Sequence, residues 1–71
     1  MSYRIEYLTE TTREDSVCHA IDVASGTLDS VEAEAMAHSQ AARQHGATGF
    51  QIRHVNAVDK VIAIVDFAEM A

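Results

Sequence analysis

The chain has 71 residues, a formal net charge of −6 and a single cysteine, Cys18. This length predicts one domain spanning residues 1–71, and the lone cysteine excludes a disulfide-stabilised secreted scaffold. The longest apolar run covers residues 61–65, whereas a membrane-spanning helix needs about 20 apolar residues. No signal-peptide pattern opens the chain. We therefore expect a cytoplasmic protein without a membrane partner, whose acidity also disfavours nucleic acid.

The first two elements form a predicted β-hairpin. Residues 3–9 (YRIEYLT) and 16–24 (SVCHAIDVA) alternate in polarity with period two, which is typical of half-buried strands. Residues 10–15 (ETTRED) are polar throughout and predict a short loop. A loop of this length favours antiparallel pairing of the two strands.

A single helix is expected over residues 27–46 (TLDSVEAEAMAHSQAARQHG). Asp29 followed by Glu32 has the spacing of a capping box, with Thr27 as the alternative N-cap. Gly46, placed after a basic turn, is typical of a helix C-terminus. The stripe expected to face the sheet is built mostly from small residues, so the helix should lie close to it.

Two more strands are predicted after the helix, over residues 50–55 (FQIRHV) and 60–67 (KVIAIVDF). Residues 56–59 form the predicted turn between them, and residues 68–71 a loose tail. The last strand is apolar on both faces, because Ile62 and Ile64 alternate with other apolar residues. This pattern indicates a strand buried on both sides.

The order β-β-α-β-β predicts an α+β fold: a four-stranded, mainly antiparallel sheet with one helix on one face. The side chains expected beneath the helix are Ile5, Tyr7, Ile21, Val23, Phe50, Ile52, Val65 and Phe67. The opposite face should carry a second apolar set, namely Leu8, Cys18, Ala20, Val55, Ile62 and Ile64. One helix cannot cover both faces, and an exposed apolar patch usually marks an interface. We therefore predict a homo-oligomer, most simply a dimer, that uses this second set as its self-association surface.

No residue pattern predicts a metal, a cofactor or a catalytic residue. The four histidines (His19, His38, His45 and His54) lack the spacing of a zinc signature. Cys18 and His19 resemble a nucleophile and its base, but neighbouring strand residues point to opposite faces. The aromatic side chains fall on the face assigned to the core, so a base-stacking surface for RNA is not expected.

The chain resembles a group of small bacterial β-β-α-β-β domains of unknown function. The resemblance lies in the aromatic-bearing first strand (residues 3–5), the segment from Asp22 to Gly26, the acidic and alanine-rich start of the helix (residues 28–35), and the closing run VIAIVDFAE at residues 61–69. The chain differs from these domains at residues 58–60, where they would be expected to have an Asp-Gly turn. It implies the same fold and a bacterial origin, and it transfers no functional residues.

These features favour a non-enzymatic, oligomeric binding or accessory module whose ligand or protein partner is unknown. One alternative is an antitoxin-like or regulatory domain that binds a basic protein through sheet-edge or surface recognition. Another is a small-molecule binder or enzyme with its site between subunits, for which Tyr7, His19, His54 and Asp66 would be the polar groups.

Overall fold

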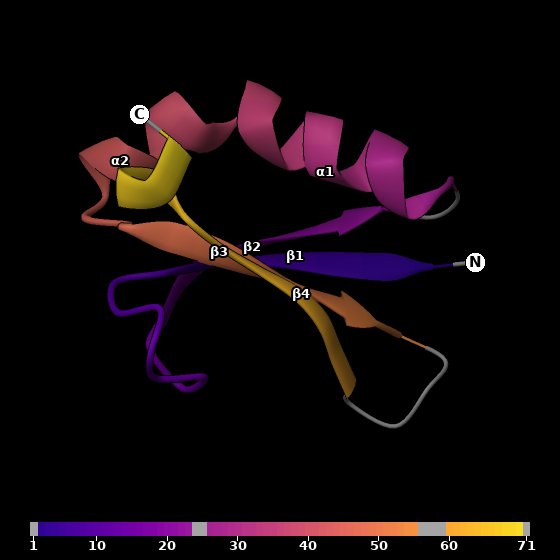
Figure 1. The fold of residues 1–71 in the computed structure, drawn as a ribbon, viewed down its shortest axis with the longest axis horizontal. Coiled ribbons are helices and arrows are strands. Elements are labelled where there is room, and N and C mark those ends of the chain that lie inside the picture. Colours follow the sequence, from indigo (N-terminus) through magenta and orange to yellow (C-terminus); the bar gives the residue numbers. More distant parts are fainter. Residues whose placement is uncertain (1, 24–25, 56–59, 71) are drawn as a thin grey trace.

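The computed structural model describes residues 2–23, 26–55 and 60–70, and it shows a four-stranded antiparallel sheet with helices on one face (Figure 1). This arrangement confirms the predicted α+β fold. The elements in chain order are β1 (Tyr3–Leu8), β2 (Val17–Val23), α1 (Leu28–Ala37), α2 (Ser39–Gln44), β3 (Gly49–His54), β4 (Lys60–Asp66) and the 3-10 helix η1 (Phe67–Met70).

The strands lie in the order β2-β1-β3-β4, and each pairs antiparallel with its neighbours. At the centre of the sheet, Ile5 of β1 pairs with Ile21 of β2 and with Ile52 of β3. The helices carry the chain from the edge strand β2 across β1 to β3. Both predicted hairpins are therefore present, and β2 and β4 are left as the two edges.

The predicted single helix is divided in two at His38, which lies between α1 and α2. His38 has φ −99° and ψ 3°, outside the range of an α-helix. The hydroxyl of Ser39 donates to the carbonyl of Met36 at 2.8 Å, and such serine contacts compete with the regular helix bonds. The expectation of one uninterrupted helix is therefore wrong.

The helix N-cap is Thr27, the alternative in the sequence prediction, and not Asp29. The Thr27 hydroxyl accepts from the amide of Ser30 at 3.2 Å, and the Ser30 hydroxyl accepts from the Thr27 amide at 3.0 Å. This reciprocal pair is a capping box in which serine replaces the usual glutamate or glutamine. Ser30, whose side chain is shorter than that of Glu32, therefore completes the cap at the start of α1.

The core lies between the helices and the sheet, as predicted. Ile5, Tyr7, Phe50, Ile52 and Phe67 are buried, and the other predicted members, Ile21, Val23 and Val65, pack against them. From the helices, Val31, Ala35 and Ala42 enter the same cluster. Two of these three are alanines, so the helices lie close to the sheet. Tyr7 donates its hydroxyl to the Ala35 carbonyl at 2.6 Å, which joins β1 to α1.

The chain end differs from the predicted loose tail, because Phe67–Met70 form the 3-10 helix η1. The guanidinium of Arg43 lies 4.4 Å from the centre of the Phe67 ring, so η1 is held against the end of α2. The turn predicted at residues 56–59 lies outside the described residues. None of the helices in the described part of the chain has the length and apolarity needed to cross a membrane.

Candidate functional site

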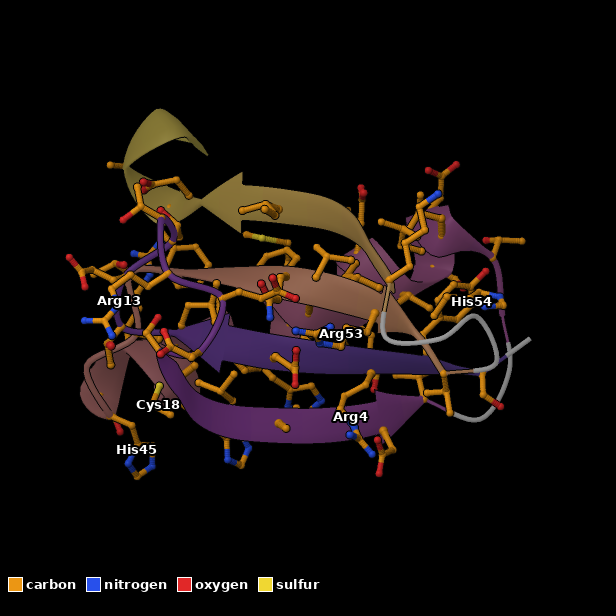
Figure 2. The ribbon with its side chains drawn as sticks, turned by 90° about the horizontal axis from the view of Figure 1, so that it is seen from below. Arg4, Arg13, Cys18, His45, Arg53 and His54 are labelled. Atoms are coloured by element: carbon orange, nitrogen blue, oxygen red, sulfur yellow. The ribbon has the colours of Figure 1, made fainter. Side chains whose placement is uncertain are left out.

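The sheet face opposite the helices, called the open face here, carries an ion network at its centre. Figure 2 looks onto this face and shows Arg53 over the middle of the sheet. The Arg53 guanidinium donates to Glu6 on the neighbouring strand β1 and to Glu14 in the β1–β2 loop. The amide of Gln51 donates to the same Glu6 carboxylate at 2.7 Å. Three segments of the chain therefore meet at one charged cluster.

The centre of this network is shielded from water, whereas Glu14 at its margin is 59% exposed. The Arg53 and Glu6 side chains are only 17% and 12% exposed, and Gln51 is buried. The hydrogen bond to Glu6, followed by the contacts with Glu14, raises the pKa of Arg53, although burial opposes the shift. Its charged groups already pair with one another, so we assign the network a structural role.

The β1–β2 loop lies on the open-face side of the sheet, below it in Figure 1. Besides the Glu14 contact, the Thr11 hydroxyl donates to the Asp66 carboxylate of β4 at 3.1 Å. Gly49 makes this approach possible, because a Cβ there would lie only 2.3 Å from the methyl carbon of Thr11 and from the carbonyl oxygen of Val65. The loop thus reaches from the β2 side of the sheet to β4.

The loop and network alter the predicted self-association surface. Leu8 is fully buried, so it is not available to a partner. Cys18 and Ala20 are exposed on β2. The larger apolar side chains, Val55, Ile62 and Ile64, are 49%, 37% and 57% exposed and lie on or near β3 and β4.

The predicted surface is therefore not one continuous apolar face. The charged network on β1 and β3 separates Cys18 and Ala20 from the two isoleucines of β4. Within one chain, β4 is not buried on both sides, contrary to the expectation from its apolar sequence. Its isoleucines, together with Val55 and with Val17 of β2 (39% exposed), are the large apolar side chains that the described part of the chain leaves exposed.

The β4 strand also carries an irregularity. Ala63 pairs with Ile52 and Val61 with Arg53, so Ile62 is skipped in the pairing with β3. This β-bulge increases the local twist of the strand. A second bulge, between Tyr7 and Leu8 in the β1–β2 pair, lies at the opposite edge.

The four histidines do not converge. His19 and His45 stack with ring centres 6.3 Å apart, and His19 also stacks on Tyr7. His38 lies 3.5 Å from the carboxylate of Glu34, whereas His54 packs edge-on against Tyr3 near the start of β1. Among the described residues, no group of three or more histidine, cysteine, aspartate or glutamate side chains has an arrangement that would hold a metal.

The polar groups suggested for a subunit-interface site are also spread apart. Tyr7 is buried and bonded to α1, and only His19 lies beside it. Asp66 accepts from Thr11 and from the Ala68 amide, and it lines a cavity of about 310 Å³. His54 lines a separate cavity of about 50 Å³. These four residues do not form a common site within one chain.

The sequence reasoning missed the network of Glu6, Glu14, Gln51 and Arg53. Strand alternation places Glu6, Gln51 and Arg53 on the face that we expected to be apolar. Three polar residues on this face were the sequence signal of a polar cluster. Their pairing, however, depends on the register between β1 and β3, which puts Glu6 opposite Gln51.

Comparisons with known proteins do not identify the chain, since no family model, curated protein or solved structure matches it.

Proposed function

We propose that this protein is a non-enzymatic binding or accessory module that acts as a homodimer in a bacterial cytoplasm. The observation that carries the proposal is the one-sided coverage of the sheet. The helices pack on one face (Figure 1), while Val55, Ile62 and Ile64 stay 37–57% exposed on the side without helices. A second copy would cover them.

The expected strength of the dimer follows from this exposed area. Burying a half-exposed valine or isoleucine contributes about 1 kcal/mol, so six such side chains contribute on the order of 6 kcal/mol. Association itself offsets much of this gain, so we expect a weak dimer that dissociates on dilution.

Sedimentation equilibrium between about 10 µM and about 1 mM, a range that spans weak affinities, tests this proposal. The wild-type chain should change from monomer to dimer as its concentration rises. The Ile62→Ser/Ile64→Ser variant should stay monomeric over the same range. The matched control is Ala33→Ser/Ala41→Ser, which places two serines at exposed helix positions and should dimerise normally. A wild-type chain that remains monomeric at the highest concentration contradicts the proposal.

A basic protein partner is a second candidate, supported by the acidic surface of α1. Asp29 is exposed and Glu32 half-buried, and neither forms an ion pair with the described residues. A partner with a basic surface would neutralise part of the net charge of −6. Pull-down from a bacterial lysate at low salt tests it: a basic protein should be retained by the wild type and lost from Asp29→Asn/Glu32→Gln. Equal retention by both chains would refute this reading.

A further inference from the structure

The outer edge of β4 is open to another strand. β4 is the last strand of the sheet and has β3 on one side only. Among the described residues, the backbone hydrogen bonds outside the regular strands and helices do not involve residues 60–66. An edge of this kind presents unpaired N–H and C=O groups to solvent, where they favour the addition of another strand.

The β4 sequence is complementary to itself. If two copies align antiparallel about Ala63, Ile62 of one lies opposite Ile64 of the other. The two Ala63 residues then meet on the two-fold axis. Alternate residues of an edge strand turn their backbone groups outward, but the bulge at Ile62 shifts this alternation, so Lys60 and Asp66 face opposite sides of the sheet. The isoleucines of both copies fall on one face.

Neighbouring alignments lose this complementarity. A shift of two residues in one direction places the charged Lys60 opposite Ile64, and a shift in the other direction places Asp66 opposite Ile62. Apolar side chains facing one another across two strands stabilise their pairing. A one-residue shift would turn the isoleucines of one copy to the other face. The alignment about Ala63 therefore pairs all four isoleucines, whereas a shift of two residues keeps one isoleucine pair, Ile62 with Ile62 or Ile64 with Ile64.

We propose that two copies pair β4 with β4 in this alignment, so that the two sheets join into one eight-stranded antiparallel sheet. This inference rests on the proposed dimer and specifies its geometry. A second copy is the occupant that fits, because this alignment pairs all four isoleucines of the two strands. The bulge at Ile62, next to the two-fold axis, interrupts the regular hydrogen bonding between the strands. The four isoleucines therefore supply most of the stabilisation.

Disulfide trapping at the two-fold axis tests the alignment. In a Cys18→Ser background, Ala63→Cys places the two thiols opposite each other. Antiparallel partners have Cα atoms about 4.5–5.5 Å apart, within the range of about 4.4–6.8 Å that a disulfide needs. The matched control is Ala20→Cys, which lies at the centre of the other edge strand, β2.

With a mild oxidant at dimer-forming concentrations, Ala63→Cys should cross-link nearly completely and Ala20→Cys should stay largely monomeric on non-reducing gels. Because Ala63 is half-buried, a second trap avoids any disturbance of the core. An equimolar mixture of Ile62→Cys and Ile64→Cys chains, both exposed positions, should cross-link more than either chain alone.

The outcomes separate the two proposals. If the wild type sediments as a dimer but neither trap cross-links, the β4 pairing is wrong while the proposed dimer stands. Preferential cross-linking of Ala20→Cys would likewise overturn the β4 pairing. If the wild type remains monomeric, both proposals fail.

Discussion

The two edge strands of the sheet, β2 and β4, have the same length but different surfaces. β2 exposes mainly short and polar side chains, among them Cys18, Ala20 and Asp22, together with Val17 at its first position. β4 exposes two isoleucines between a lysine and an aspartate. In a two-fold pairing of β2 about Ala20, Cys18 would lie opposite Asp22, without opposite charges, and Val17 would lie opposite Val23 only at the ends of the strand. We therefore expect β4, more than β2, to add another strand.

Two features of β2 lead us to expect weaker association at this edge. Charged residues on an edge strand disfavour the addition of another strand, and Asp22 already pairs with Arg4 at 2.9 Å. His19 stacks between Tyr7 and His45 and so belongs to the contact between the sheet and the end of α2. The central ion network keeps this side of the open face apart from the isoleucines. Four predictions test the contrast between the two edges.

The largest effect should come from breaking the ion network, which lies between the β2 and β4 sides of the open face. Arg53→Met leaves the Glu6 carboxylate, which is 12% exposed, without its cation. We expect a loss of about 2 kcal/mol in the free energy of unfolding, below the figure for a fully buried pair because some water reaches this one. Arg4→Met, on the β2 side, removes a pair that is 47% and 73% exposed and should cost less than about 1 kcal/mol. Urea unfolding at equal protein concentration measures both, and equal losses would contradict the structural role of the network.

The next prediction compares the two edge strands directly, by placing a lysine on each of them. Lysine on an edge strand discourages pairing, so Ile64→Lys should weaken dimerisation at least about tenfold, which corresponds to about 1.4 kcal/mol. Ala20→Lys places the same charge at the centre of β2 and should leave the dissociation constant unchanged. Sedimentation equilibrium of both variants gives the comparison. A loss confined to Ala20→Lys would reverse the assignment of the edges.

Tyr7, next to β2 in the sheet, should have a smaller effect. Tyr7→Phe removes the hydroxyl donated to Ala35 and should lower the free energy of unfolding by about 1 kcal/mol at neutral pH. Burial, and secondarily the charge of Glu34, raises the pKa of Tyr7. The folded state therefore holds this proton more tightly than the unfolded state, and this stabilisation is lost as the pH rises above about 10. Unfolding followed across alkaline pH should show a shallower decline for Tyr7→Phe, and identical slopes would refute this assignment.

The smallest effect concerns the charges at the ends of β4. Lys60→Glu replaces a positive by a negative charge at the exposed start of β4 in both acidic copies and should weaken the dimer by less than about 1 kcal/mol. Salt screens exposed charges, so the difference from the wild type should shrink at about 1 M salt, where the screening length falls to about 3 Å. Dissociation constants at low and high salt provide the measurement. A deficit that does not change with salt would argue against an electrostatic cause.

The strands and the core could be predicted from the sequence, because alternation with period two directly reflects which side chains face the helices. The helix break could not, since His38 is neither proline nor glycine and no local signal marks it. Asp29 and Glu32 matched the usual capping pattern, yet the shorter Ser30 side chain completes the box with Thr27. Which residues form the cap depends on the side-chain and backbone geometry within the first helical turn.

The candidate surface was predicted in part. Ile62 and Ile64 are exposed on the face without helices, the face to which strand alternation assigns them. Leu8 was misassigned because alternation gives its face but not the loop that covers it. The pairing of Glu6 with Arg53 joins residues 47 positions apart, and only the strand register brings them together.

The absence of a side chain at Gly49 also has a consequence for how the chain folds. Because Thr11 crosses closely over Gly49 to bind Asp66, the loop that follows β1 can adopt its final position only after β3 and β4 have joined the sheet. We therefore expect the first hairpin to form early with a loosely held loop, which then closes as the last step. Native-state hydrogen exchange should report this order, with the amide of Arg13, bonded to the Glu10 carbonyl, opening more readily than the amides of β1 and β3.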